Sequence, residues 1–301
     1  MNENSNNSDL LLEQPFTRMS SDQVRGTFLG LTIGDALGAY LEFSEKREPE
    51  NYLREYKVGG PHRLEAGYWT DDTSMALAIA DSLQLSRGKF DPHITMRNFY
   101  DLYGKGAFSS TGDCFDIGMT CQEALRLYEK DPSNPYVGST AEYSSGYGTI
   151  MRIAPVVITA ITEGDAVNCA LLQTRLTHGS NECHLFSEIY GRELWHSMAV
   201  PEYEEFRIAR ETPREEVQNS GYVRHTYEAA WWCVQNTESF EAAVIEAVNL
   251  GGDSDTIGAV TGPIAGRIFG ASSIAPKMYE GLYANQAIDH LAESLYELNS
   301  P

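Results

Sequence analysis

Two short acidic clusters in the chain have the composition of metal sites. The first is Thr70–Asp72, which directly precedes the alanine-rich run SMALAIADSLQL, and the second is Asp253–Thr256, which directly follows two glycines. Threonine and aspartate at these places are also typical of helix caps, where they suit the positive end of the helix dipole. A cap accounts for one acid in each cluster. It accounts less well for two neighbouring acids, whose mutual repulsion a divalent cation relieves.

The donor atoms of the two clusters indicate which metals would bind. Carboxylate and hydroxyl oxygens without a nearby histidine or cysteine favour Mg²⁺ or Mn²⁺ over zinc. Two such clusters can hold two ions that share ligands, roughly 3.5–4 Å apart, which is a common arrangement in hydrolases. An EF-hand loop that starts at Asp253 is excluded, because its twelfth position would be Ile264. An Asp-x-Asp nucleophile should follow a buried strand, whereas the preceding SFEAAVIEAVNL is typical of a helix.

A third acidic segment, LGLTIGDALGAYLEF, carries Asp35 and Glu42. The two acids are about two helical turns apart, so they can share one face of a helix. Each can be a solvated surface charge. A carboxylate inside a glycine-rich apolar helix is, however, costly to bury without a partner. We therefore take Glu42, at the end of the segment, as a candidate general acid or base.

Two further segments are candidates for binding a substrate. The run SSGYG, residues 144–148, offers hydroxyls and backbone N–H groups that can cradle a phosphate, although an ordinary turn has the same composition. Its tyrosine can stack on a base or simply pack. A histidine in LTHGSNEC follows an amphipathic run, where it is either a cap, a structural residue or a group that contacts a ligand. The candidate substrate-binding residues are Asp35, Ser144, Ser145, Gly146, Tyr147, Gly148 and His178.

The elements that must position these residues are predicted to be helices. Strand-like alternation is scarce, and residues 201–220 are strongly charged, which predicts an exposed excursion rather than a domain boundary. The simplest prediction is one compact all-α domain, a helical bundle. Alanine-rich periodic runs, separated by proline or glycine, recur at 74–85, 114–128, 166–178, 185–198, 227–234 and 239–250.

Two glycine ladders indicate how the central helices pack. A glycine inside a helix costs roughly 1 kcal/mol relative to alanine, so a ladder is unfavourable unless two backbones must approach closely. Ridges of small residues are best known from membrane helices, but Asp35 and Arg267 interrupt the apolar runs here. We therefore expect two tightly packed central helices in a soluble bundle. The ladders are Gly26, Gly30, Gly34, Gly38 and Gly258, Gly262, Gly266, Gly270.

The composition limits the classes of partner. The chain has 301 residues and a net charge of −21, which argues against nucleic-acid backbones and anionic membrane surfaces as partners. Its five cysteines are an odd number without a C-x-x-C pair, so we expect free thiols in a reducing compartment. The first residues lack the basic start and apolar run of a signal peptide, and no run is long enough to span a membrane. These features predict a cytoplasmic protein.

The N-terminal segment differs in composition from the rest. Residues 1–22 are polar and rich in asparagine and serine, and we interpret them as a flexible arm that precedes a catalytic domain at 23–301. The arm is either simple terminal disorder or a docking segment that orders on a partner.

Taken together, the segments resemble the ADP-ribosylglycohydrolase family, which includes dinitrogenase-reductase-activating glycohydrolase. The similarity rests on GDALGAYLE, WTDDTSMAL, GTIMRIAPV, THGSNE and LGGDSDTIGAVTGPIAG in this order. It covers residues 23 to 270, which is most of the predicted domain. Its most specific pieces are the motifs T-D-D and G-G-D-S-D-T.

The resemblance implies an all-α fold with two Mg²⁺ or Mn²⁺ ions in a central cleft. It also implies hydrolysis of the bond between C1 of the distal ribose of ADP-ribose and a protein side chain, often arginine. In this comparison Glu42 matches a catalytic or gating acid, Asp71 and Asp255 are further catalytic candidates, and residues 144–148 fall in the diphosphate cradle. The implied metal ligands are Thr70, Asp71, Asp72, Asp253, Asp255 and Thr256.

One residue departs from the family pattern. The family usually has G-N-G before M-R, whereas this chain has Gly146-Tyr147-Gly148. Tyr147 can replace the asparagine by stacking on a ligand, or it can narrow the cleft, so the departure bears on the substrate rather than on the metals.

Besides release of ADP-ribose from modified protein, two alternatives stay open. One is hydrolysis of another ADP-ribose conjugate, and the other is an immunity protein that also blocks an ADP-ribosyltransferase toxin through its N-terminal arm.

Overall fold

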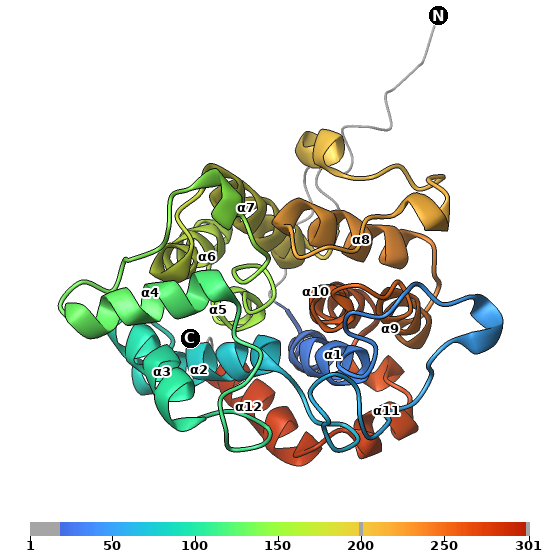
Figure 1. The fold of residues 1–301 in the computed structure, drawn as a ribbon, viewed down its shortest axis with the longest axis horizontal. Helices are drawn as coiled ribbons and strands as arrows, with labels where there is room; N and C mark the ends of the chain where they lie inside the picture. Colours follow the sequence, from blue (N-terminus) through green and yellow to red (C-terminus); the bar gives the residue numbers. More distant parts are fainter. Residues whose placement is uncertain (1–18, 199–200, 299–301) are drawn as a thin grey trace, which may run out of the picture.

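The computed structural model describes residues 19–198 and 201–298, and this part of the chain is all-α (Figure 1). Its β-type pairings are isolated bridges, such as Gly146 with Tyr222. The predicted fold class is therefore confirmed. The α-helices are α1 (Ser21–Gly38), α2 (Asp71–Leu85), α3 (Pro92–Lys105), α4 (Met119–Lys130), α5 (Ala154–Ile158), α6 (Glu163–Thr177), α7 (Asn181–His196), α8 (Val223–Gln235), α9 (Phe240–Val248), α10 (Ser254–Phe269), α11 (Pro276–Gly281) and α12 (Asn285–Leu298). Short 3-10 helices are η2 (Pro49–Asn51), η3 (Glu142–Ser144), η4 (Pro201–Phe206), η5 (Arg214–Glu216) and η6 (Ala271–Ser273).

Helices α1 and α10 cross at the centre of the molecule, where Figure 1 shows them side by side. They run antiparallel, and their glycines face each other so closely that a Cβ atom on one would overlap the backbone of the other. Backbones can approach this closely only where both residues lack side chains. The close packing predicted from the ladders is confirmed. The facing pairs are Gly26 with Gly266, Gly30 with Gly262 and Gly34 with Gly258.

The fourth rung differs from the prediction. Gly270 does not face a glycine of α1; it follows the end of α10 with a φ of +78°, and a Cβ atom on it would overlap the Asp22 carboxylate of α1. The residue opposite Gly38 is Ser254, and a Cβ atom on Gly38 would overlap the Ser254 carbonyl oxygen and lie 2.5 Å from the Cα of Asp255. The ladder therefore ends at the second acidic cluster and holds this cluster against the end of α1.

The other helices surround this pair. Helices α8 and α9 pack on α10, α12 packs on α1, and α2 contacts both central helices. The surrounding helices supply further large buried side chains, among them Phe99 of α3, Phe186 of α7 and Tyr227 of α8. Because α2 and α10 both begin beside α1, the first turns of these helices lie close together.

The helices depart from the predicted runs in several places, since α3, α5, α11 and α12 were not among these runs and α4 is shorter than expected. The run 114–128 was expected to be helical throughout, but α4 begins only at Met119. Asp116 has a φ of +62°, which interrupts a helix. Helix α3 was not among the predicted runs, although its start carries a clear signal. Asp91 caps it by accepting hydrogen bonds from the backbone N–H groups of His93 and Ile94, and Pro92 follows the cap.

The described residues begin slightly before the predicted domain boundary at residue 23. Helix α1 starts at Ser21, and Ser20 caps it by accepting a hydrogen bond of 3.2 Å from the Gln23 N–H. The other residues of the predicted arm, 1–18, lie outside the described residues. All five cysteines are free thiols, as predicted. Among the helices that the structure describes, none is long and apolar enough to cross a membrane.

Candidate active site and metal centre

The two acidic clusters meet at the first turns of α2 and α10. Thr70 and Asp253 stand at the N-cap positions of these helices, yet neither side chain makes a capping hydrogen bond. The Thr70 hydroxyl instead lies 2.9 Å from Asp35 Oδ1 and 3.2 Å from Asp255 Oδ2. Capping by these side chains therefore does not account for the clusters.

Three carboxylates from three helices form the buried centre. Asp35 of α1, Asp72 of α2 and Asp255 of α10 each place a carboxylate oxygen within 4.8 Å of the other two. The hydroxyl of Thr256 lies 3.4 Å from Asp72 Oδ2. Five of the six predicted metal ligands are thus linked by side-chain contacts. They are Thr70, Asp72, Asp253, Asp255 and Thr256. The sixth, Asp71, is also buried but faces the adjoining pocket.

Asp35 has a structural role in this centre. Its Oδ1 accepts a hydrogen bond of 2.9 Å from the Thr70 backbone N–H, and its Oδ2 accepts one of 2.9 Å from the Thr73 N–H. The carboxylate therefore binds the free N–H groups at the start of α2. It does not line the pocket, where we expected it to bind substrate.

The residues present fit a divalent cation. One carboxylate oxygen of each of Asp72, Asp253 and Asp255 is buried without a hydrogen-bond partner in the described part of the chain. Burial, followed by the charge of neighbouring acids, raises the pKa of Asp72 and Asp255 well above its usual range. Burial raises the pKa of Asp253 to about 6. So many buried carboxylates need protons or a cation, and hard oxygen donors of this kind suit a divalent ion.

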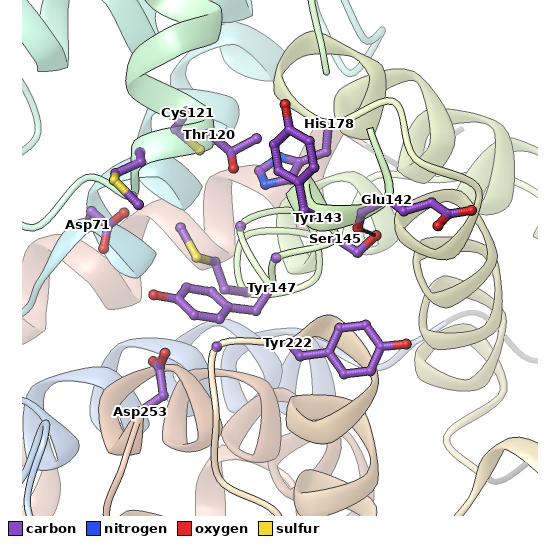
Figure 2. Close-up of a pocket in the computed structure, with 16 residues that line it drawn as sticks. Asp71, Thr120, Cys121, Glu142, Tyr143, Ser145, Tyr147, His178, Tyr222 and Asp253 are labelled. Atoms are coloured by element: carbon purple, nitrogen blue, oxygen red, sulfur yellow. Dashed lines mark hydrogen bonds between the residues drawn. The ribbon is translucent and has the colours of Figure 1, made fainter. Parts of the chain in front are cut away.

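A pocket of about 460 Å³ opens beside the centre. Figure 2 shows Asp71 and Asp253 at one end and the loop with Ser145, together with His178, at the other. Helix α4 contributes Met119, at the rim and 86% exposed. The pocket thus joins the acidic centre to the glycine-containing loop.

The loop 144–148 offers backbone groups rather than serine hydroxyls. The hydroxyl of Ser144 donates to the Ala141 carbonyl at 2.6 Å, and that of Ser145 lies 2.7 Å from the Glu142 carbonyl oxygen. Ser144 does not line the pocket, whereas Ser145, Gly146 and Gly148 do. The hydroxyls therefore hold the loop in shape.

Tyr147 bridges the two ends of the pocket. Its backbone N–H donates to the Gly221 carbonyl at 3.3 Å. A Cβ atom on Gly221 would lie 3.0 Å from the Tyr147 ring and 3.2 Å from Asp253 Oδ2, so the glycine leaves room for both side chains. Figure 2 shows the phenol pointing toward the end that holds Asp71 and Asp253. Burial, followed by the charge of Asp253, raises the pKa of Tyr147 well above its usual range, so the phenol keeps its proton.

Glu42 lies in a second cluster that the sequence did not predict. Its Oε2 is 2.5 Å from His62 Nε2, and the same nitrogen is 3.3 Å from Asp116 Oδ1. The hydrogen bond with Glu42 raises the pKa of His62, and burial raises the pKa of Asp116 to about 8. His62 precedes the first acidic cluster in sequence, and Asp116 is in the segment expected to be helical. Neither position carries a local signal that distinguishes it from a surface residue.

A sequence model of the family described as ADP-ribosylglycohydrolase matches residues 17–301. The chain belongs to the ADP-ribosylglycohydrolase family. It is 35% identical to ADP-ribosylarginine hydrolase Tri1 of Serratia proteamaculans, over 92% of this chain and 80% of that protein. It is 31% identical to the ADP-ribosyl-[dinitrogen reductase] glycohydrolase of Rhodospirillum rubrum, over 84% and 87%.

The fold is also that of a solved member of this ADP-ribosylglycohydrolase group. A structure described as an ADP-ribosylglycohydrolase-related protein complex superposes with a TM-score of 0.79 and 34% identity, covering 93% of this chain and 99% of that one. Family membership makes this chain a glycohydrolase with an acidic centre that can bind metal.

Proposed function

We propose that this enzyme uses two divalent ions, Mg²⁺ or Mn²⁺, to remove ADP-ribose from modified arginine side chains of proteins. The observation that carries the proposal is the buried carboxylate centre with orphaned oxygens, which adjoins a pocket of about 460 Å³. The name of the Serratia relative, an ADP-ribosylarginine hydrolase, supports the choice of linkage. The proposed ligands are Thr70, Asp71, Asp72, Asp253, Asp255 and Thr256.

The chemistry of the bond fits the charges around the centre. Cleavage at the anomeric carbon builds positive, oxocarbenium-like character, which nearby carboxylates stabilise. Bound ions would supply the positive charge that orients ribose hydroxyls and makes a water molecule more acidic. Glu42 and Asp116 are the candidates that carry the proton between water and the leaving nitrogen, and His62 holds the two acids together.

The remainder of the ligand would lie along the pocket. Gly146 and Gly148 border the space between the metal centre and the far end, so a diphosphate can approach the backbone there. Tyr147 takes the place of the usual asparagine and reaches the ribose end instead of the phosphate end. We therefore propose that it contacts the distal ribose.

The decisive experiment compares three substrates, proteins that carry labelled ADP-ribose on arginine, serine or an acidic residue. We expect the arginine-linked label to be lost and free ADP-ribose to appear. Release of AMP, or loss of label only from another linkage, would contradict the proposal and favour hydrolysis of a different conjugate.

A second experiment tests the metal ions. Excess chelator should stop the reaction and Mg²⁺ or Mn²⁺ should restore it, and full turnover in chelator would rule out the metals. Asp113→Asn, which removes an exposed carboxylate outside the centre, is the control.

The role as an immunity protein stays a prediction. It depends on the N-terminal arm, and residues 1–18 lie outside the described residues. A cognate ADP-ribosyltransferase toxin would be captured by the full chain and not by a variant without residues 1–18. Equal capture by both would contradict docking through the arm.

A further inference from the structure

Phe43 combines two features that are unfavourable for stability. Its side chain is 72% exposed, although a phenylalanine gains free energy from burial. Its φ is +62°, in the left-handed region that a residue with a Cβ atom adopts only at a cost. Strained backbone of this kind persists where the surrounding structure holds it, and it is concentrated at functional sites. The combination therefore indicates that the exposed ring has a role in binding.

Two backbone hydrogen bonds hold Phe43 in this conformation. Its N–H donates to the Gly252 carbonyl at 2.6 Å, and the Gly252 N–H donates to the Ser44 carbonyl at 2.8 Å. Gly252 directly precedes Asp253, which is one of the proposed metal ligands. The turn that presents the Phe43 ring is thus tied to the segment that carries this ligand.

The ring stands at the outer end of the cluster formed by Glu42, His62 and Asp116. Its centre lies 6.5 Å from the centre of the His62 ring, and His62 contacts both acids. Exposure rises along this path, because the side chain of Glu42 is 4% exposed and that of His62 is 18% exposed. The cluster therefore leads from the interior to the surface, and Phe43 is its most exposed neighbour.

The cluster adjoins the metal centre but lies outside the pocket. Burial, followed by the charge of Asp116, raises the pKa of Asp71. Burial, followed by the charge of Glu42, raises the pKa of Asp255. The cluster is thus close enough to the proposed ligands to interact with them, yet neither its members nor Phe43 line the pocket. A ligand whose ADP part fills the pocket leaves this route to the surface free for the group attached to C1 of its distal ribose.

The side chains along this route fit a guanidinium. A guanidinium is planar and always cationic, pairs with carboxylates and stacks on aromatic rings. The inner part of the route has two carboxylates for the single imidazole of His62, and the outer part has the exposed ring of Phe43. A group linked through serine or through an acidic side chain carries no charge that an aromatic ring would attract.

We propose that Phe43 is a specificity-determining residue whose ring stacks on the guanidinium of the arginine that is released. The identity of this leaving group rests on the proposed function. The contact forms in the bound substrate, where the guanidinium carries the positive charge. When the bond to C1 breaks, its electron pair stays with the guanidine nitrogen and the positive charge passes to the ribose. The ring therefore strengthens the binding of the substrate and does not accelerate bond cleavage.

The first measurement is the hydrolysis of ADP-ribosylagmatine, which has the guanidinium linkage without a protein, in the presence of Mg²⁺. Phe43→Leu keeps an apolar side chain and removes the ring, so KM should rise about fivefold without a fall in kcat. Phe43→Trp should retain the low KM. The inhibition constant of ADP-ribose, which lacks the guanidinium, should be the same in all three proteins. Ile161→Ala, which truncates a side chain of similar exposure between α5 and α6, is the control.

Three results would overturn the proposal. The first is an unchanged KM in Phe43→Leu, and the second is an equal rise in the inhibition constant of ADP-ribose, which would indicate a disturbed metal centre. The third is an effect on ADP-ribosylated protein alone, which would mean that the ring contacts the protein surface around the arginine. Phe43→Gly separates binding from stability, because glycine adopts this φ without strain. Its melting temperature should not fall, and a marked fall would show that the ring has a structural role instead.

A binding experiment distinguishes failure of this proposal from failure of the proposed function. In protein with labelled phenylalanine rings, methylguanidinium should shift the NMR signal of the Phe43 ring, which Phe43→Leu assigns. Methylurea, a neutral molecule of the same shape, should not shift it. If the unaltered protein does not cleave ADP-ribosylagmatine, the proposed function fails, and the ring signal still tests the guanidinium contact. A signal that does not respond to methylguanidinium would overturn the contact.

Discussion

The two ends of the pocket carry opposite charges that the described residues leave uncompensated. At one end, buried carboxylates at the starts of α2 and α10 have oxygens without partners among the described residues. Behind the other end, the buried Arg152 has no acidic partner among the described residues, and it donates to the Thr177 hydroxyl, whose oxygen lies 2.8 Å from Nδ1 of His178. The first end lacks cations and the second lacks an anion. A ligand with a sugar at one end and a diphosphate in its middle, bound together with divalent ions, would compensate both.

The largest effect is expected from Asp255→Asn, which removes charge at the carboxylate end only. Because the proposed ions would supply several kcal/mol of transition-state stabilisation, hydrolysis should fall at least about 100-fold. In the presence of chelator the variant should melt at a higher temperature than the unaltered protein, because one repelling carboxylate is gone. Rate assays and thermal melts check both. A variant that melts at a lower temperature in chelator would show that the carboxylates do not strain the metal-free protein.

Glu42→Gln separates proton transfer from the binding of ions. We expect a rate loss of about 100-fold, typical of a lost general acid or base. Calorimetric binding of Mn²⁺ should persist, because Glu42 is held by His62 in the second cluster. If the variant hydrolyses at the normal rate, Glu42 has no part in the mechanism. If it loses the ion instead, Glu42 belongs to the metal centre.

Gly38→Ala tests whether the ladder serves the carboxylate end specifically. The added methyl group would lie 2.5 Å from the Cα of Asp255, so α10 must shift at its first turn. We expect Mn²⁺ affinity to fall by at least about tenfold, since ligand geometry sets affinity, with little change in adenosine binding at the other end. The matched control is Gly104→Ala in α3, where nothing lies within 4 Å of the added atom. It should stabilise the protein by up to about 1 kcal/mol, as measured by chemical denaturation.

The smallest effect concerns the pH dependence of stability at the His178 end. Burial, followed by the charge of Arg152, lowers the pKa of His178 from 6.5 to about 3. Between these values the unfolded chain binds a proton that the folded protein excludes, so this group makes stability fall as the pH falls from 6.5 toward 3. The slope is about 1.4 kcal/mol per pH unit. His178→Gln should lose this part of the slope in denaturation series between pH 4 and 7. An unchanged slope would mean that His178 is protonated in the folded state.

The sequence predicted the features that repeat or stand together along the chain. The clusters at Thr70 and Asp253 were recognisable because acids and hydroxyls are adjacent there, and the ladders because glycine recurs every fourth residue. His62 and Asp116 could not be found in this way, since each acquires its role from a contact between segments that are distant in sequence. We expected Asp35 to bind substrate and did not foresee its hydrogen bonds to the start of α2. These bonds join two segments, so the spacing of residues within one segment does not reveal them.

Gly270 shows a related limit of sequence periodicity. The four-residue spacing of the second ladder continues to Gly270 without change, but α10 ends there. At the start of α10, Ser254 is the residue that faces the fourth glycine of α1, Gly38. A periodic pattern gives the face of a helix and not the register of its partner. Register follows from three-dimensional packing, here from the antiparallel crossing of α1 and α10.

The pairing of α1 with α10 has a consequence for biosynthesis. Helix α1 is synthesised more than 200 residues before α10, on which its glycine face packs. The centre therefore forms late, after the intervening helices, as expected for contacts of high sequence separation. A nascent chain without α10 has Asp35 and Asp72 but not Asp255, so the acidic centre is completed only after α10 has been made.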